Sequence, residues 1–333
     1  MTLEELKHIL AEASQVFVLT DEHVAPLWMP EAEHWLGCER AVEIVVKAGE
    51  SSKNLTTVRR IWKTLLKHGA DRHAVMVNLG GGVITDLGGF AASCYQRGIR
   101  FVNVPTTLLA MVDAAWGGKT GIDFEGCKNQ IGVFAQPLDV LVKPVLLSTL
   151  PDRELRSGMA EMVKCGFIAD KHLLKVGPDN YEQYLLRAGA IKNEIATRDP
   201  FDHGCRKALN FGHTLGHAIE SVALKTESPL THGEAVAIGM ACALRISVWQ
   251  CGLSESVVSD YEPTLKMLLA KAPSIPITIN DVEAIMAFLV HDKKNRHGDN
   301  AFVLLEDVER PVWDRPVPEQ LVRKSFSEVI PQL

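Results

Sequence analysis

The feature that most limits the fold of this chain is a regular alternation, over its first 150 residues, of short apolar runs with segments of helical spacing. A rhythm of this kind builds a mostly parallel sheet covered by helices on both faces. In such sheets ligands bind beyond the carboxyl ends of the strands. We predict strands at Val16–Leu19, Ile44–Val46, Val75–Leu79, Phe101–Val104 and Val140–Val142, and helices at Leu55–His68 and Asp86–Cys94.

After Pro151 the pattern becomes helical, and only Ala301–Leu305 reads as a strand. The predicted helices are Asp152–Ala169, Tyr181–Arg198, Phe211–Val222, Gly233–Trp249, Ser254–Ala270 and Asp281–Leu289. A chain of 333 residues is long enough for two domains. We therefore expect an α/β Rossmann-like N-terminal domain with a mostly parallel sheet, residues 1–150, and an all-α C-terminal domain, residues 151–333.

Composition narrows the class of protein. Hydrophobic residues make up 47% and charged residues 23%, which is typical of a folded globular chain. The net charge of −6, without a long basic run, argues against nucleic acid as a partner, so an anionic substrate needs a local cluster of lysine and arginine. Seven scattered cysteines indicate free thiols in a reducing compartment. With no signal-like start and no apolar run of membrane-spanning length, we expect a cytoplasmic protein without a membrane partner.

Histidines mark the candidate chemistry of the second half. His213 and His217 are four residues apart, so on a helix both imidazoles leave the same face, and His232 precedes an apolar helix. Imidazoles gathered in this way bind a divalent metal such as zinc, usually together with a carboxylate. Interior histidines held by hydrogen bonds are the alternative. Arg206 and Asn210, expected on the same helical face, weigh against it, because so polar a face is costly to bury without a ligand.

A carboxylate for that set is available from Glu161, which shares a helical face with Lys164. An ordinary ion pair would explain these two residues equally well. Together with His213 and His232, however, Glu161 completes an acid and two imidazoles with room for substrate oxygens, which is the catalytic arrangement of a metal site. The run His213-Thr-Leu-Gly-His217 lacks the glutamate of His-Glu-x-x-His, so a metalloprotease is disfavoured.

Two glycine-rich turns could hold phosphates. Gly80–Gly82 joins a predicted strand to the helix expected near Asp86, where backbone amides can approach a pyrophosphate, although a plain tight turn explains the glycines equally well. Asp86 could bond a ribose hydroxyl or simply begin the helix. Near Lys119, the phosphate-loop spacing fails because Asp113 stands where a glycine is needed. Lys119 and Lys128 on neighbouring loops suit a polyhydroxylated anion, or are solvated surface lysines.

The polar run from His291 to His297 follows an apolar helix. Such a run is usually a solvated helix end. In this chain it could also bring a lysine over the site.

In their order and spacing these strings resemble the 3-dehydroquinate synthase family from about Thr20 to Gly298. The matching strings include Gly-Gly-Gly-Val-Ile-Thr-Asp (80–86), Val-Pro-Thr-Thr-Leu-Leu-Ala-Met-Val-Asp (104–113), Gly-Gly-Lys-Thr (117–120), Lys-Asn-Gln (128–130), Glu-Met-Val-Lys (161–164), Leu-Asn-Phe-Gly-His-Thr-Leu-Gly-His-Ala (209–218), His-Gly-Glu-Ala-Val (232–236) and Asp-Lys-Lys (292–294). The resemblance implies a homodimer that binds NAD and a divalent metal, zinc or cobalt. It implies conversion of 3-deoxy-D-arabino-heptulosonate 7-phosphate to 3-dehydroquinate and phosphate, in the shikimate route to aromatic amino acids.

The resemblance also implies roles for individual residues. The metal ligands would be Glu161, His213 and His232. The NAD site would be lined by Asp21, Glu50, Lys53, Gly80, Gly81, Gly82, Val83, Asp86, Thr106, Thr107, Asp113, Lys119, Lys128, Leu146 and Thr149. The substrate would meet Asp113, Lys119, Lys128, Asn129, Lys164, Lys192, Arg206, Asn210, His217 as a proton relay, and one lysine of the 293–294 pair, which we assign to Lys294. Arg97 would reach the substrate phosphate in the neighbouring subunit's site.

The chain departs from the family's pattern at a few positions. Thr85 replaces a usual glycine, His23 an asparagine that often contacts adenine, and Asp202 a common glutamate, while Ala114-Ala115-Trp116 replaces Ser-Ser-Ile. These changes alter the surroundings of the expected NAD site and leave every expected metal ligand in place.

Three other functions compete with this interpretation. A sister sugar-phosphate cyclase, of the 2-deoxy-scyllo-inosose or valiolone type, would change the residues that contact the substrate carboxylate. In this chain Lys192, Arg206 and Asn210 are retained, and they suit a carboxylate. A metal-dependent alcohol dehydrogenase of the same architecture would produce NADH without releasing phosphate. A non-catalytic binding protein is disfavoured because no site position is lost.

Overall fold

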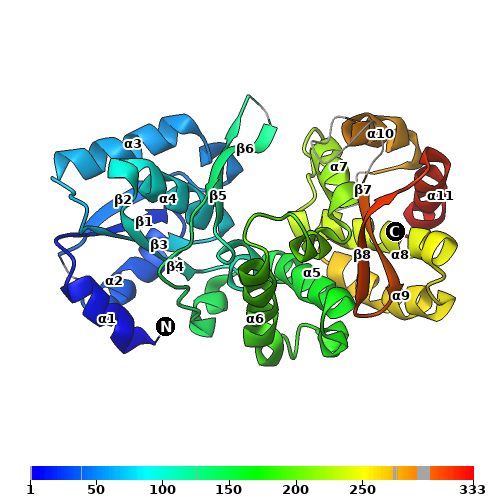
Figure 1. The fold of residues 1–333 in the computed structure, drawn as a ribbon, viewed down its shortest axis with the longest axis horizontal. Coiled ribbons are helices and arrows are strands. Elements are labelled where there is room, and N and C mark those ends of the chain that lie inside the picture. The colour runs from blue at the N-terminus through cyan, green and yellow to red at the C-terminus, as the bar shows by residue number, and fades with distance from the viewer. Residues whose placement is uncertain (1, 39, 126, 273–274, 276, 291–300) are drawn as a thin grey trace. The chain divides into compact units, whose positions relative to one another are not determined.

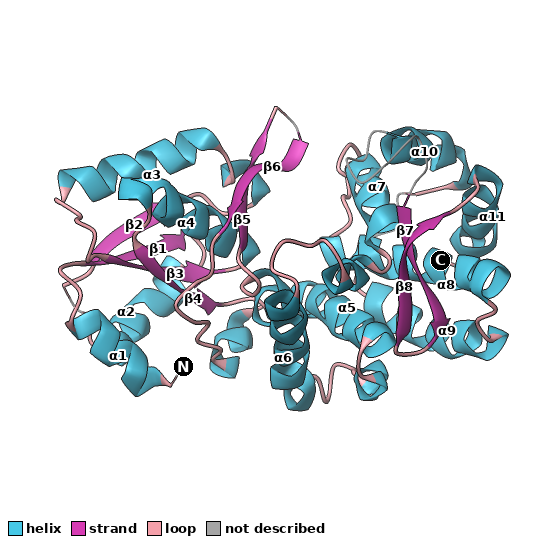
Figure 2. Ribbon diagram, viewed as in Figure 1, coloured by secondary structure: helices cyan, strands magenta, loops and turns pink. Residues whose placement is uncertain are grey.

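The chain divides into two compact units, Met1–Leu150 and Pro151–Leu333. The computed structural model describes residues 2–38, 40–125, 127–272, 275, 277–290 and 301–333. Figure 1 follows the described chain by colour, and Figure 2 separates its helices from its strands.

A four-stranded parallel sheet forms the centre of the first unit. Its order is β2-β1-β3-β4, and its strands are β1 (Val16–Asp21), β2 (Val42–Val46), β3 (Val75–Gly80) and β4 (Arg100–Pro105). The chain leaves β1 for β2 on one side and later enters β3 on the other. The carboxyl ends of β1 and β3 therefore flank the switch point of the sheet, where α/β folds bind ligands.

Helices cover both faces of this sheet (Figure 1). They are α1 (Leu3–Ala11), α2 (Ala25–Leu36), α3 (Leu55–Lys67) and α4 (Gly82–Cys94), with α3 and α4 on one face and α1 and α2 on the other. Asn54 caps α3 by accepting a hydrogen bond from the Thr57 amide. Val58, Ile61 and Leu65, at helical spacing, then join the core above the sheet.

The structure corrects several expectations for this unit. Val140 forms only an isolated bridge with Asn103, so Val140–Val142 is not a strand, and α4 begins at Gly82 instead of Asp86. An antiparallel hairpin of β5 (Lys119–Phe124) and β6 (Cys127–Phe134) stands where two loops were expected. Every residue that the structure describes in β6 is exposed, so this strand carries no alternation of apolar and polar residues to indicate it. Short helical turns complete the unit: η1 (Glu50–Ser52), η2 (Tyr95–Arg97), η3 (Ala110–Ala114) and η4 (Pro144–Thr149).

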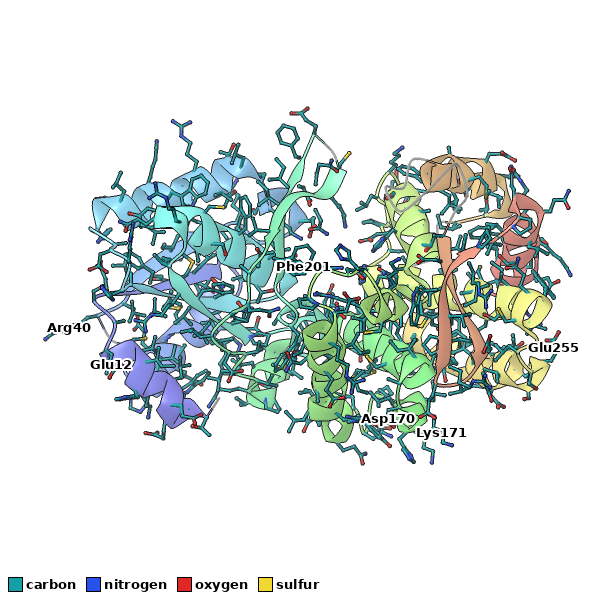
Figure 3. The ribbon with its side chains drawn as sticks, in the orientation of Figure 1. Glu12, Arg40, Asp170, Lys171, Phe201 and Glu255 are labelled. Carbon is teal, nitrogen blue, oxygen red and sulfur yellow. The ribbon has the colours of Figure 1, made fainter. Side chains whose placement is uncertain are left out.

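The second unit is largely helical. Its helices are α5 (Asp152–Ile168), α6 (Glu182–Arg198), α7 (His213–Ala223), α8 (His232–Cys251), α9 (Glu255–Leu269), α10 (Val282–Val290) and α11 (Glu319–Val329), with turns η5 (Lys171–Lys175), η6 (Cys205–Asn210), η7 (Ile279–Asp281) and η8 (Ile330–Gln332). The six predicted helices are present, and α11 was not expected. Arg187 of α6 donates to Asp170 at 2.8 Å. Asp170 and Lys171, in the turn after α5, are labelled in Figure 3.

The second unit also contains an antiparallel β-hairpin. The predicted strand is β7 (Ala301–Asp307), and it pairs with β8 (Arg310–Pro316), so the expectation of a single strand was wrong. The strand β8 begins beside one proline, ends on another and is mostly exposed. These features resemble a loop in the sequence.

Helix α8 forms the core of the second unit and packs against α5, α7, α9 and α11. It is long and apolar enough to cross a membrane by length and composition, contrary to the expectation that no run would be. Its residues are mostly buried among these neighbours, and Tyr261 of α9 donates to the Ala237 carbonyl at 3.0 Å. Such packing is typical of a core helix.

The start of α8 is held tightly against α5. A Cβ added to Gly233 would lie 2.1 Å from the Ser157 carbonyl oxygen, so only glycine allows this approach. The Gly233 amide donates to the Ser157 hydroxyl at 3.0 Å. Arg153 donates to both carboxylate oxygens of Glu234, in the first turn of α8, at 2.7 and 2.6 Å. This contact places His232 beside Glu161, which lies one turn beyond Ser157.

We expect Gly233→Ala to lower the free energy of unfolding by about 1–3 kcal/mol, because the new methyl group must push α8 away from α5. Urea unfolding followed by circular dichroism measures the change. Gly177→Ala is the matched control, since a Cβ there meets only the Asn180 side chain at 4.0 Å. Equal stability of the two variants would contradict the close contact.

Candidate metal centre and cofactor-binding residues

Glu161 lies at the centre of the second unit, on the buried part of α5. Its side chain is 1% exposed, and Lys164, equally buried, donates to its Oε2. Among the described residues Oε1 accepts no hydrogen bond, although it lies 3.4 Å from Nε2 of His213 and 3.4 Å from Nε2 of His232. A buried carboxylate oxygen without a donor is an incomplete site for a cation or a proton donor.

His213 begins α7, and His217 follows one turn later with its ring centroid 5.2 Å away. These two histidines share a face, as predicted. The expectation that Arg206 and Asn210 continue this face was wrong, because η6 ends at Asn210 and the chain turns at Gly212. Gly212 has a φ of 76°, and a Cβ there would lie 2.5 Å from Met240 of α8. The turn brings α7 against α8.

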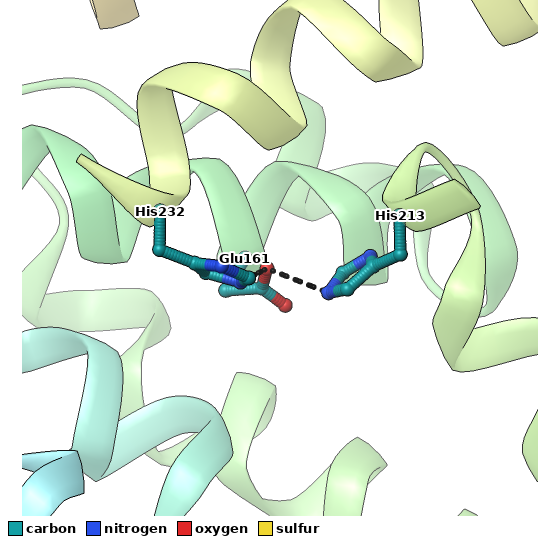
Figure 4. A group of neighbouring side chains, drawn as sticks. All are labelled: Glu161, His213 and His232. Carbon is teal, nitrogen blue, oxygen red and sulfur yellow. Dashed lines mark ion pairs between the residues drawn. The ribbon is translucent and has the colours of Figure 1, made fainter. Parts of the chain in front are cut away.

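The three predicted ligands meet at one point (Figure 4). One donor atom each from Glu161, His213 and His232 lies within 4.8 Å of the others. The Nδ1 atom of His213 faces the Phe211 carbonyl at 3.1 Å, which leaves Nε2 for the centre. One carboxylate and two imidazoles form a donor set that suits zinc or cobalt and leaves coordination positions for other oxygens. The residues present therefore fit a catalytic metal.

The charges of this cluster are set by burial and by its neighbours. Burial raises the pKa of Glu161, but Lys164 and His213 outweigh that effect, so its pKa lies well below the usual value. Burial and the adjacent Lys164 lower the pKa of His213 well below its usual value. Burial also lowers the pKa of His232, but the neighbouring carboxylates of Glu161 and Glu220, 3.4 and 3.5 Å away, raise it to about 10. At neutral pH the metal-free cluster holds an anionic Glu161, a neutral His213 and a protonated His232.

We expect zinc binding at pH 8 to release about one proton per site, because a ligating imidazole must be neutral and His232 starts protonated. The pKa of His232 is raised, so zinc affinity should increase with pH until that pKa is passed. Calorimetry in two buffers of different protonation enthalpy measures the proton. A binding heat that is the same in both buffers would contradict the assigned charges.

The remaining residues predicted for the substrate in this unit lie on α6, α7 and η6. Arg206 is 2% exposed, and its Nη1 donates to the Pro200 carbonyl at 2.9 Å. Asn210 donates to the Lys207 carbonyl at 3.1 Å. Lys192 is half-buried on α6, which packs against η6. His217 is exposed beside the cluster, 5.9 Å from His232 between ring centroids. Lys294 lies outside the described residues.

The residues predicted for the cofactor gather at the carboxyl ends of the parallel strands. Asp21 ends β1, Glu50 and Lys53 follow β2, Gly80–Gly82 joins β3 to α4, and Thr106–Thr107 follows β4. The first turn of α4, which includes Val83, has no side-chain cap, so its amides can bind an anion. Among the described residues the buried Thr106 hydroxyl makes no hydrogen bond. These features fit a dinucleotide.

Lys53 connects this edge to the hairpin. Its Nζ is buried and donates to Asp86 and to Asn129, each at 2.6 Å, and it lies 3.8 Å from Glu50. Burial lowers the pKa of Lys53, but Asp86 and Glu50 outweigh that effect and raise it. Burial raises the pKa of Glu50. Lys53 is therefore a charged centre that joins α4, η1 and β6.

The other predicted cofactor residues lie on the short turns η3 and η4 or on the β5–β6 hairpin. Asp113 lies on η3, and Lys119 and Lys128 lie on β5 and β6, both exposed. Leu146 and Thr149 lie on η4, where the Thr149 hydroxyl accepts from Trp28 at 3.0 Å.

Arg97 does not lie with the predicted cofactor residues. It is exposed after the last turn of α4, whereas the cofactor glycines begin that helix, and 13 helical residues span about 20 Å.

The departures noted in the sequence have local explanations. The Thr85 hydroxyl is satisfied within α4 by the Gly82 carbonyl at 3.0 Å. His23 is exposed in the turn that Asp21 closes, where the Asp21 carboxylate accepts from the His23 amide at 2.9 Å. Asp202 has a φ of 61°, a conformation that aspartate tolerates better than most residues.

The first unit has a parallel sheet with candidate ligand-binding residues at its switch point, and the helical unit holds an acid and two histidines. These features define a class of two-unit α/β enzymes with a candidate metal centre. The models of the 3-dehydroquinate synthase N-terminal and C-terminal regions match residues 43–157 and 158–295. A 3-dehydroquinate synthase from Parabacteroides distasonis is 39% identical over 303 residues, 88% of this chain and 85% of the relative. The chain belongs to the 3-dehydroquinate synthase family.

Solved structures of related cyclases share the fold. A 2-deoxy-scyllo-inosose synthase complexed with carbaglucose-6-phosphate, NAD+ and Co2+ is 26% identical with a TM-score of 0.84, covering 98% of this chain and 95% of that chain. A 2-epi-5-epi-valiolone synthase from Streptomyces hygroscopicus subsp. jinggangensis, with NAD+ and Zn2+ bound, is 27% identical with a TM-score of 0.83, covering 96% and 91%. The expected fold class, an α/β unit followed by a helical one, is confirmed, except that the β7–β8 hairpin makes the second unit largely helical and not all-α.

One residue of the cluster was not predicted. Glu220 follows His213 and His217 on the same face of α7, and its Oε2 lies 3.5 Å from Nδ1 of His232. The i, i+4, i+7 spacing of two histidines and a glutamate is the signal that could have indicated it.

Proposed function

We propose that this chain converts 3-deoxy-D-arabino-heptulosonate 7-phosphate to 3-dehydroquinate and phosphate, a step of the shikimate pathway. The observation that carries the proposal is the meeting of Glu161, His213 and His232 in a chain of the 3-dehydroquinate synthase family. The free cysteines support a reducing, cytoplasmic location.

NAD and a divalent metal, zinc or cobalt, are the cofactors in this proposal. Two solved relatives contain NAD+ with Co2+ or Zn2+. The first unit of this chain supplies the uncapped start of α4 and the buried Thr106 hydroxyl, which has no hydrogen-bond partner among the residues that the structure describes. When bound, these groups supply a reversible hydride acceptor and a Lewis acid for a ring hydroxyl of the substrate. Residues 1–150 would then be the NAD-binding unit, and residues 151–333 the metal- and substrate-binding unit.

In this proposal the residues of the first unit bind NAD and orient it. The amides of Gly82 and Val83, in the uncapped first turn of α4, would hold a pyrophosphate. Asp86 would accept from ribose hydroxyls, and Lys53 fixes its carboxylate by donating to it at 2.6 Å. The same lysine fixes Asn129, so the hairpin that carries Lys128 is anchored to the cofactor residues.

The residues of the second unit hold the metal and the anionic groups of the substrate. Glu161 is charged and His213 neutral before any ligand arrives, so these two ligands need no proton change. Arg206, with Nη1 held by Pro200, presents a pre-oriented planar donor to a carboxylate or phosphate, and Lys192 and Asn210 add further donors. His217, exposed beside the ligands, is the candidate to relay a proton.

A sister cyclase activity is the second candidate, because both solved relatives named above are sugar-phosphate cyclases of other specificity. Their identity to this chain, 26% and 27%, is lower than the 39% shared with the 3-dehydroquinate synthase of Parabacteroides distasonis. The retained carboxylate-binding set of Lys192, Arg206 and Asn210 also favours the heptulosonate substrate.

We expect the purified protein with NAD and zinc to release inorganic phosphate from the heptulosonate phosphate without net formation of NADH. His213→Ala and Glu161→Ala should lower this rate by about 100-fold or more, because each removes one of three metal ligands. A coupled phosphate assay and absorbance at the NADH band measure both. His172→Ala, at an exposed histidine, is the control.

Other outcomes identify the competing functions. Phosphate release from glucose 6-phosphate, with none from the heptulosonate, would assign a sister cyclase. Net NADH without phosphate would assign an alcohol dehydrogenase. Full activity in His213→Ala would remove that histidine from the metal ligands.

A homodimer in which Arg97 serves the neighbouring subunit's site belongs to the same proposal. Arg97 is exposed and lies at the opposite end of α4 from the cofactor glycines of its own chain. An exposed arginine at that end of α4 would be available to a phosphate held by a neighbouring subunit.

We expect Arg97→Ala and His213→Ala to be nearly inactive separately and to recover activity when subunits are mixed. Each mixed dimer has one intact site, so random exchange should restore about a quarter of wild-type turnover per subunit. Phosphate release after mixing and re-equilibration measures the recovery. No recovery, with subunit exchange demonstrated by native mass spectrometry, would place Arg97 in its own chain's chemistry or outside it.

A further inference from the structure

His232 lies between two carboxylates that come from different helices. Its Nε2 is 3.4 Å from Glu161 Oε1 of α5, and its Nδ1 is 3.5 Å from Glu220 Oε2 of α7. Glu220 is buried, with a relative exposure of 7%. A buried carboxylate is destabilising unless it is paired. Each nitrogen of the His232 imidazole therefore faces a carboxylate before a metal is present.

We propose that Glu220 is a positioning residue of the metal centre. Its carboxylate accepts the Nδ1–H of His232, which fixes the ring orientation and leaves the Nε2 lone pair for the metal. Outer partners of this kind fix the tautomer of a ligating histidine and raise its basicity. The inference rests on the proposed metal role of Glu161, His213 and His232, and it adds a residue that none of the comparisons assigns.

The two histidines are oriented by different kinds of partner. Nδ1 of His213 faces the backbone carbonyl of Phe211 at 3.1 Å, a neutral acceptor that no substitution removes. His232 uses a side-chain carboxylate instead, which is charged and can be replaced. The orientation of His232 therefore depends on the side chain at position 220, whereas the orientation of His213 depends on a backbone group.

The balance of charge gives Glu220 a second effect on the metal. Lys164 donates to Glu161, so this buried pair has no net charge. When both imidazoles are neutral, the charge of the described cluster is set by Glu161, Lys164 and Glu220. Glu220 adds the second carboxylate, which makes the net charge negative. A dication is attracted more strongly by such a cluster, because the effective dielectric constant of a buried site is low.

Zinc affinity of the full chain, measured by competition with a chromophoric chelator, tests the proposal. We expect Glu220→Ala to weaken zinc binding by about 10–100-fold. Glu220→Gln should lose less than Glu220→Ala, because its amide oxygen can still accept from Nδ1–H. Glu227→Gln, which removes an exposed acid from the loop after α7, should bind zinc like the wild type.

Cobalt spectra separate positioning from a merely structural role. With Co2+ bound, both Glu220 variants should show shifted d–d absorption bands, because the geometry and basicity of His232 change. A Glu220 that only holds α7 against α8 would leave the bands of the bound ion unchanged. Where Glu220→Ala does not fold, as judged by thermal unfolding and NAD binding, the spectrum of Glu220→Gln decides.

Three results would overturn the proposal: zinc affinity of Glu220→Ala within twofold of wild type, an equal loss in Glu227→Gln, or unchanged cobalt bands in the folded variants. His213→Ala separates this failure from that of the proposed function. If His213→Ala keeps its zinc, the metal assignment itself is wrong. If it loses zinc while Glu220→Ala does not, only the role of Glu220 is wrong.

Discussion

The second unit depends on a buried carboxylate, that of Glu161, with only one of its two oxygens hydrogen-bonded within the described part of the chain. Glu161 is 1% exposed, and burying an ion without partners costs several kcal/mol. Lys164 satisfies Oε2, and Oε1 faces imidazoles from two other helices. Bringing three helices to one oxygen requires close backbone contacts, which Gly212 and Gly233 permit. The two glycines therefore support the candidate metal site, although neither provides a ligand.

The first unit also depends on a buried charged pair, which lies at the edge of its sheet. The strand order places the ends of β1 and β3 on either side of the switch point, so backbone topology alone gathers the cofactor residues there. The hairpin β5–β6 is a separate sheet, and topology does not fix its position. The buried ammonium of Lys53 provides that connection through Asp86 and Asn129. In both units, a buried lysine paired with an acid supports the candidate site.

The parts of the fold that could be predicted are those in which burial leaves a pattern. The parallel strands are apolar runs because they are covered on both faces, and α3 shows its buried stripe at Val58, Ile61 and Leu65. The exposed strands β6 and β8 leave no such pattern. Glu161, His213 and His232 could be grouped because a metal explains the cost of burying them. The spacing of Glu220 from His213 and His217 indicates that the three share a face of α7, but only the tertiary contact shows that Glu220 meets His232.

The most direct test of the account is an anomalous difference map, collected at the zinc absorption edge, from crystals grown with zinc. The account predicts one strong peak in the second unit, about 2.0–2.2 Å from Nε2 of His213, Nε2 of His232 and a carboxylate oxygen of Glu161. A map with no peak at these three residues, and with zinc bound only elsewhere on the chain, would contradict it.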